Sequence, residues 1–284
     1  MATRFWVGGS GTWDGSDTSH WSDTSGGSNG RSVPTSSDDV FFDAASGAGT
    51  VTQDAAAAIS CKSLTCTGFT GTLNFNTGQS VYVYGSMLLV AGMTYTHAGG
   101  TKVVFRGGGA TCNLTTAGKT LGHVYCGFSS EAPTLTLQDA MTSNGTVALN
   151  HGTLNTNGQT CSWGSFSSSN TNTRTLTLGA SAITVTGILA WDCSTDTNMT
   201  FTPGTSTITL SGAGAYFQVG STPGSRAGVY NNVVFTGSGN HLINRGCTIA
   251  NLTVTGTANK TDTLMLRGNA STVTVTGTFT VNGN

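Results

Sequence analysis

The sequence predicts an all-β protein and, within that class, a parallel β-helix (β-solenoid) with an aromatic-rich N-terminal cap. The chain of 284 residues holds 41 glycines but only 4 prolines and 8% charged residues. Its Thr, Val, Ile and Leu residues alternate in short runs between glycines and asparagines, which is typical of short strands joined by tight turns. Internal repetition is the third observation, and it favours stacked coils.

A strand–turn–strand motif occurs three times, at residues 72–85, 174–187 and 263–277. In the first two copies Gly85 corresponds to Gly187, and the segments that follow them keep a similar offset. A shorter element begins at Asn232 and again at Asn251. This shorter spacing is close to one solenoid coil, which takes about 20 residues, so we predict about ten coils over residues 55–284.

Alternation within the motif predicts which side chains fill the bore, the space inside the coils. Apolar residues at every second position should point inward, and the intervening Thr and Tyr residues should point outward. The expected inward residues are Val81, Val83, Ile183, Val185, Val273 and Val275. Tandem antiparallel β-sandwiches would show the same alternation and are the alternative fold.

Charge and aromatic content separate residues 1–54 from the rest of the chain. Residues 1–54 contain seven acids and two bases, whereas residues 55–284 contain five acids and nine bases. We expect the first segment to be an acidic cap that covers the end of the stack and docks to a partner. The remainder is expected to be the solenoid, with super-repeats near 72–173 and 174–262 and a partial third copy at 263–284. The candidate docking residues are Phe5, Trp6, Trp13, Trp21, Phe41 and Phe42.

Two other kinds of site are considered in the solenoid. Exposed aromatic side chains suit glycan binding, and the candidate platform residues are Trp163, Trp191, Tyr216 and Phe217. A polysaccharide-cleaving enzyme would need a pair of carboxylates. The candidate pairs are Asp192 with Asp196 and Glu131 with Asp139.

Several classes of function are not expected. The seven cysteines are scattered without a Cys-x-x-Cys pair, and the Asp-rich stretches lack EF-hand spacing, so we predict no metal and no cofactor. The net charge of −1 comes without a basic stripe, which argues against nucleic-acid binding. No stretch approaches the roughly 18 apolar residues of a membrane span, and no secretory leader is visible, so we expect synthesis in a cytoplasm without membrane insertion.

The run Phe-Trp-Val-Gly-Gly-Ser-Gly-Thr-Trp-Asp at 5–14 and the run Gly-Thr-Ser-Thr-Ile-Thr-Leu-Ser-Gly at 204–212 resemble Gly/Thr-rich β-helical structural proteins of tailed bacteriophages. They are also similar to autotransporter passenger repeats. The resemblance implies a non-enzymatic virion protein, such as a tail or head fibre, spike or decoration protein. Its expected partners are other virion proteins, further copies of itself (a trimer would suit a fibre or spike) and a host surface glycan. A glycan-binding receptor module and a depolymerase spike are the alternatives.

Overall fold

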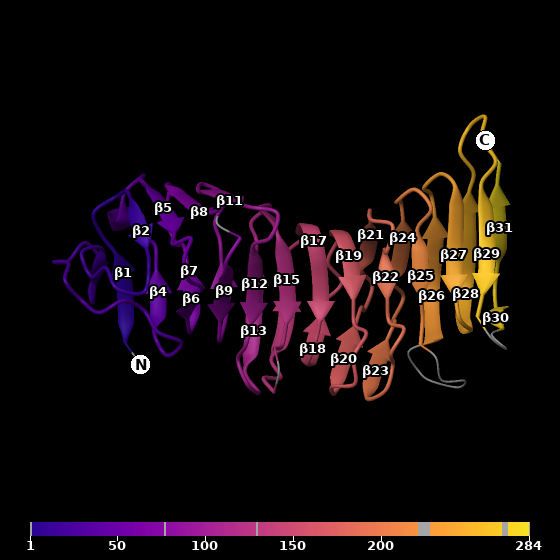
Figure 1. Ribbon diagram of the computed structural model, residues 1–284, viewed down its shortest axis with the longest axis horizontal. Helices are drawn as coiled ribbons and strands as arrows, with labels where there is room; N and C mark the ends of the chain where they lie inside the picture. The colour runs from indigo at the N-terminus through magenta and orange to yellow at the C-terminus, as the bar shows by residue number, and fades with distance from the viewer. Residues whose placement is uncertain (1, 77, 129, 221–227, 269–271, 284) are drawn as a thin grey trace. The chain divides into compact units, whose positions relative to one another are not determined.

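The computed structural model describes residues 2–76, 78–128, 130–220, 228–268 and 272–283, and the chain divides into two compact units, Met1–Gly145 and Thr146–Asn284. Each unit consists of parallel strands stacked coil upon coil, which confirms the predicted β-solenoid (Figure 1). The alternative of antiparallel sandwiches is therefore wrong. The described residues contain almost no helix, and the short 3-10 helix η1 (Ala44–Ser46) is the helical element whose bounds the structure gives.

The strands of the first unit form three faces of the solenoid. One face carries β1 (Thr3–Trp6), β4 (Asp39–Phe41), β7 (Ser63–Thr65), β10 (Met87–Leu88), β13 (Thr111–Thr115) and β16 (Thr134–Leu137). A second face carries β2 (Gly11–Trp13), β5 (Thr50–Gln53), β8 (Thr72–Phe75) and β11 (Thr94–His97). The third carries β6 (Ile59–Cys61), β9 (Ser80–Val83), β12 (Lys102–Phe105) and β15 (His123–Cys126). The short strands β3 (Trp21–Ser22) and β14 (Thr120–Leu121) pair with β1 and with β17 (Met141–Leu149).

Strand register gives the length of a coil. Ile59 lies opposite Val81, and Val81 lies opposite Val103. On the second face, the hydrogen-bonded side chains of Thr52 and Asn74 lie on neighbouring coils and are 22 residues apart in the sequence. Facing residues on neighbouring coils of the third face have the same separation. Val81 is fully buried, as the alternation predicted. The bore of the first unit is thus filled by a column of apolar side chains.

The second unit stacks its coils in the same way. One face carries β18 (Gly152–Asn155), β20 (Arg174–Thr177) and β23 (Met199–Thr202). The remaining strands are β19 (Cys161–Ser167), β21 (Ala182–Val185), β22 (Trp191–Asp192), β24 (Thr207–Leu210), β25 (Tyr216–Gln218), β26 (Val229–Phe235), β27 (Asn240–Asn244), β28 (Cys247–Thr255), β29 (Thr263–Arg267), β30 (Val273–Val275) and β31 (Phe279–Asn282). Ile183, Ile208 and Val233 lie opposite one another on successive coils. The step here is 25 residues, as between the hydrogen-bonded side chains of Thr207 and Asn232.

The structural repeat is the single coil. Asn232 lies opposite Asn251, so the shorter spacing seen in the sequence is one turn of the coil. Each of the three copies of the motif contains two strands that follow one another in the chain: β8 and β9, β20 and β21, and β29 and β30. The offset between Gly85 and Gly187 therefore covers several coils.

Polar side chains join neighbouring coils from outside. The Thr96 hydroxyl donates to the Asn74 side chain at 2.9 Å, and the Asn251 amide donates to Asn232 at 2.8 Å. A buried hydroxyl does the same at a corner, where Ser181 donates to Thr156 at 2.8 Å. These hydrogen bonds allow a chain with few charges to keep its polar groups satisfied.

Candidate docking site on the N-terminal cap

The interior of the cap is an aromatic cluster. Trp6, on β1, lies opposite Trp21, on the antiparallel strand β3, and their rings meet edge to face at 5.1 Å. The Trp6 indole also stacks on His20 at 4.6 Å and donates from Nε1 to the Gly9 carbonyl at 2.7 Å. The strand β3 covers the outer edge of β1, so this end of the stack is sealed.

Burial decides which of the predicted docking residues can meet a partner. Trp6, Trp13, Trp21 and Phe42 are at most 1% exposed. The docking prediction is wrong for these four side chains, because they form the core of the cap.

Phe5 and Phe41 remain at the surface. They lie opposite one another on the parallel pair β1 and β4, and their rings stack at 4.9 Å. Both are half-buried, whereas Val40, next along β4, points inward and is fully buried. Strand alternation thus leaves one aromatic pair on the outside of the cap.

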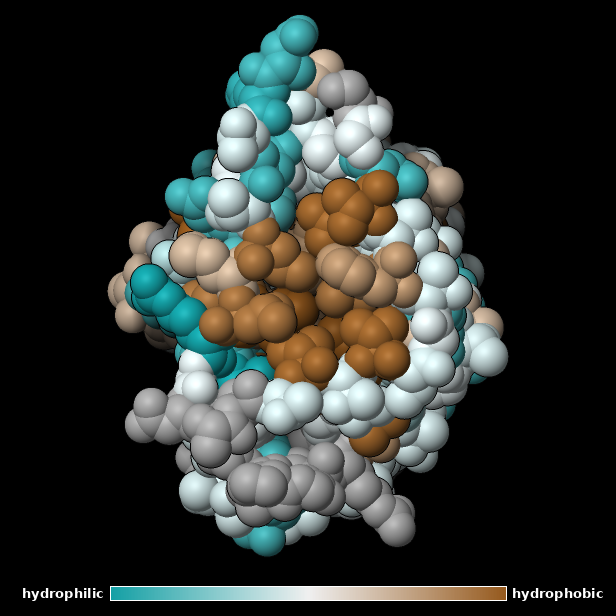
Figure 2. Space-filling view, turned by 90° about the vertical axis from the view of Figure 1, so that its right-hand side faces the viewer, coloured by the Kyte–Doolittle hydropathy of each residue, from teal (hydrophilic) through white to brown (hydrophobic). Residues whose placement is uncertain are grey.

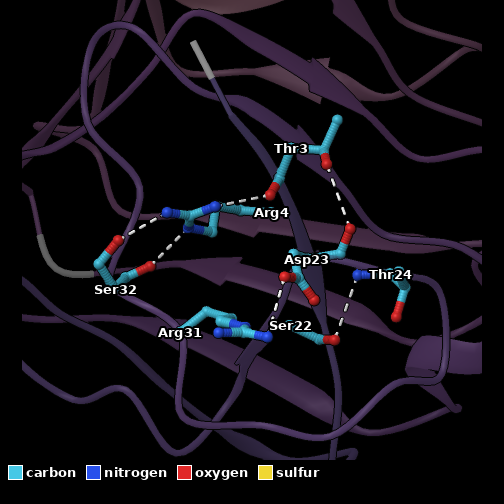
Figure 3. A network of polar contacts seen from close by, with 7 residues as sticks. All are labelled: Thr3, Arg4, Ser22, Asp23, Thr24, Arg31 and Ser32. Atoms are coloured by element: carbon cyan, nitrogen blue, oxygen red, sulfur yellow. Dashed lines mark hydrogen bonds and ion pairs between the residues drawn. The ribbon is translucent and has the colours of Figure 1, made fainter.

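A polar network links the start of β1 to the segment that follows β3 (Figure 3). The Arg4 guanidinium donates to the Ser32 carbonyl at 2.8 Å and to the Ser32 hydroxyl at 2.7 Å. Arg31 pairs with Asp23 at 3.0 Å, and these two side chains are 56% and 48% exposed. Such an exposed ion pair contributes little to stability, so a partner can replace it at small cost.

We call the pair Phe5 and Phe41 the cap face. Ser22, on β3, lies opposite Phe5, whereas Arg4 lies opposite the inward-pointing Val40 and therefore projects from the other side of β1. A half-exposed pair of stacked aromatic rings is suited to binding a protein surface.

Asp38 fixes the first strand beneath this face. Its carboxylate accepts hydrogen bonds from the Ala2 backbone at 2.9 Å and from the Thr35 hydroxyl at 2.8 Å. Burial alone would raise the pKa of Asp38, but the hydrogen bonds from Thr35 and Ala2 outweigh it and lower the pKa. A buried carboxylate therefore anchors the start of the described chain.

The predicted glycan platform is not at the surface. Trp163, Trp191 and Phe217 are fully buried, and only Tyr216 is half-exposed. Trp191 packs against Phe166 at 4.3 Å and Phe217 at 6.2 Å. The platform prediction is wrong for the three buried rings, since they fill the bore of the second unit.

The candidate catalytic acids hold turns and loops. Asp192 accepts from the Ser194 backbone at 2.9 Å, and Asp139 accepts from the Thr116 and Ala117 backbone groups at 2.9 and 2.6 Å. Glu131 pairs with Arg106 at 2.5 Å. Asp196 is 6% exposed, near Arg174.

One surface cluster was missed in the sequence. The Arg106 guanidinium lies over the rings of Tyr82, Tyr84 and Phe128 at 4.9, 5.5 and 5.1 Å while it binds Glu131. Phe128 is 42% exposed. The coil length was the available signal, because one coil step from Tyr84 reaches Arg106.

Within the described ranges, no three His, Cys, Asp or Glu side chains gather closely enough to hold a metal ion. None of the helices that the structure describes has the length and apolar character needed to cross a membrane.

No protein-family model, curated protein or solved structure matches the chain.

Proposed function

We propose that the chain is a non-enzymatic structural component of a tailed-phage particle, a fibre, spike or decoration protein, and that it docks through the cap face. The observation that carries this proposal is the arrangement of aromatic residues in the cap. Four large aromatics seal the coil stack from inside, while Phe5 and Phe41 stack on the outside of the cap.

The coils support a structural role. Apolar side chains fill the interior, and Thr and Asn side chains join adjacent coils on the outside. The acids of residues 55–284 take part in turns, ion pairs or buried contacts; Asp262, for example, accepts hydrogen bonds from Gly239 and Thr257. These carboxylates stabilise the fold where they lie.

The test is incorporation of variant chains into particles of the encoding phage. Phe5→Asp places a charge on the cap face and should reduce the amount of chain per particle at least tenfold, while the thermal unfolding of the purified protein changes little. Phe128→Asp makes the same change at an exposed aromatic residue elsewhere in the first unit and should leave incorporation intact. Normal incorporation of Phe5→Asp would overturn the docking face, and absence of the wild-type chain from particles would overturn the proposed function.

Glycan binding is the second candidate, and the observation that favours it is the Arg106 cluster. Tyr82, Tyr84 and Phe128 supply ring faces, and Arg106 and Glu131 supply polar groups. Aromatic rings beside such groups are a common way to bind sugars. Saturation-transfer NMR with host-surface polysaccharide should show binding that Phe128→Ala removes; an unchanged signal would exclude this cluster.

A further inference from the structure

Apolar side chains are exposed at the last coil of the second unit, at Leu266, Phe279 and Val281, and Figure 2 shows apolar residues gathered on this side of the unit. Nothing in the structure shows what covers them. The third face of the first unit, formed by β6, β9, β12 and β15, is more informative. Its outer side combines tyrosine rings with cations, which together indicate the chemistry of a ligand.

Two tyrosines flank one valine on this face. Tyr82 of β9 and Tyr125 of β15 lie opposite Val104 of β12, and all three point away from the bore because the residues beside them in each strand are buried in it. Val104 is 2% exposed although it faces outward, so the larger rings on either side cover it. The tyrosines themselves are half-buried. Two strand spacings, about 10 Å, separate their backbones, so a ligand that meets both rings must run along the stack of coils.

Lys102 is the cation beside these rings. It lies on β12 two residues before Val104 and therefore projects from the same outer side, opposite Ser80 and His123. Its flexible four-carbon stem is long enough for the ammonium group to reach the edge of the tyrosine pair.

The charge of Lys102 is not neutralised by the protein. Arg106 pairs with Glu131 at 2.5 Å, whereas Lys102 forms no ion pair with any acid among the described residues. The four strands of the third face contain no Asp or Glu. The face is thus complementary to a ligand that carries negative charge.

We propose that the third face binds an acidic polysaccharide, with Tyr82 and Tyr125 as platforms for sugar rings and Lys102 as the residue that binds a sugar carboxylate. Rings placed on strands at a fixed spacing of about 4.8 Å suit a polymer of repeating units. Aromatic surface supplies contact area, and one placed charge supplies specificity. The inference rests on the glycan-binding role proposed for the Arg106 cluster, with which it shares Tyr82, and it adds the chemical class of the sugar.

Calorimetric titration of the full chain tests this inference. The probes are polygalacturonate, alginate and hyaluronate, each compared with the same polymer after its carboxyl groups have been reduced to alcohols. We expect the chain to bind the acidic forms and to bind the reduced forms about fivefold more weakly, which is the size expected of one exposed charge pair.

Variants separate the charge from the rings. Lys102→Gln should weaken binding of the acidic forms about fivefold and leave binding of the reduced forms and the thermal unfolding unchanged, whereas Lys102→Arg should retain wild-type affinity. Tyr125→Ala should weaken binding of both forms alike. The matched control is Lys260→Gln, which removes the same charge from an exposed turn of the second unit and should change nothing.

The outcomes distinguish this inference from the role on which it rests. Absence of binding to every polymer, acidic or reduced, would overturn both. Equal binding of the acidic and reduced forms, or normal binding by Lys102→Gln, would overturn the acidic specificity and leave glycan binding in place. Polyglutamate that binds as tightly as the acidic polysaccharides would show that charge alone attracts the ligand, and would also overturn the inference.

Discussion

Arg174 is a fully buried side chain whose hydrogen bonds join two loops of the second unit. Its guanidinium donates to the Ser168 carbonyl and hydroxyl and to the Thr195 and Thr197 carbonyls, the last two at 3.0 and 2.8 Å. Its Nε donates to the Asn172 carbonyl at 3.0 Å. One planar cation therefore satisfies backbone carbonyls that would otherwise be buried without donors.

Arg174→Met should destabilise the second unit by about 3–5 kcal/mol, because it leaves these carbonyls unpaired. Arg174→Lys keeps the charge but cannot reach both loops, so it should recover less than half of the loss. Urea unfolding followed by circular dichroism gives both values. A Met variant within about 0.5 kcal/mol of wild type would contradict this role.

Asp38 predicts a pH dependence. Its pKa is lower in the folded protein than in the unfolded chain, so its stabilising effect is present above the unfolded value of about 3.9 and is lost as the pH falls through the folded value. The difference in unfolding free energy between wild type and Asp38→Asn should be about 2 kcal/mol from pH 8 to 5. It should shrink below about pH 4. A difference that stays constant down to pH 2 would refute this account.

At the scale of single residues, the sequence predicted correctly that some side chains point into the bore, but it failed for others. Alternation placed Val81, Val83 and Ile183 in the bore, because their strands are long enough for the pattern to be unambiguous. Trp191 lies on β22, a strand of two residues, where no alternation exists to show which side faces inward. Sequence reasoning therefore assigned it an exposed position that the structure excludes.

Among the elements, one corner of the second unit depends on stacked glycines. Gly158, Gly179 and Gly204 have φ values of 72°, 58° and 59°, a conformation that favours glycine. A Cβ on Gly204 would collide with the carbonyl oxygen of Gly179, whereas a Cβ on Gly158 would meet open space.

Gly204→Ala should therefore cost about 3 kcal/mol, from backbone strain and from the collision. Gly158→Ala carries only the backbone strain and should cost about 1 kcal/mol. Thermal unfolding of the two variants compares them under identical conditions. Equal losses would show that the collision is relieved by movement of the corner and that tight stacking is not required.

At the scale of the elements, strand positions and coil length could be predicted from the sequence. The spacing from Asn232 to Asn251 was interpreted correctly as one coil. Coils are not equal, however, since Asn232 and Asn251 are 19 residues apart, whereas the next coil step, from Asn251 to its hydrogen-bonded partner Thr278, covers 27 residues. Turn insertions of this size hide the register in the second unit, whereas the regular step of 22 residues in the first unit is enough to place Arg106 on Tyr84.

At the scale of the whole chain, the buried cysteines report on the integrity of both bores. Burial raises the pKa of Cys126 and of Cys193 to about 12, so their thiolates are scarce at neutral pH. The native protein should show no fast-reacting thiol toward a disulfide reagent at pH 8, and the urea-unfolded chain should show all seven. Two or more fast thiols in the native protein would mean that a bore is open to solvent.

The two ends of the chain differ in a way that composition only half revealed. Aromatic enrichment predicted a cap, and burial of Trp13 and Trp21 explains why that segment needs large rings. The exposure of Phe279 and Val281, at 56% and 66%, gave no signal in the sequence, because these residues have the same alternating pattern as strands that are covered.

Cryo-electron microscopy of particles purified from cultures in which this chain is expressed tests the proposed virion role most directly. The account predicts density for the coils of this chain in the particle, with Phe5 and Phe41 in contact with another virion protein. Particles without this chain, or a chain attached through a surface other than the cap face, would contradict it.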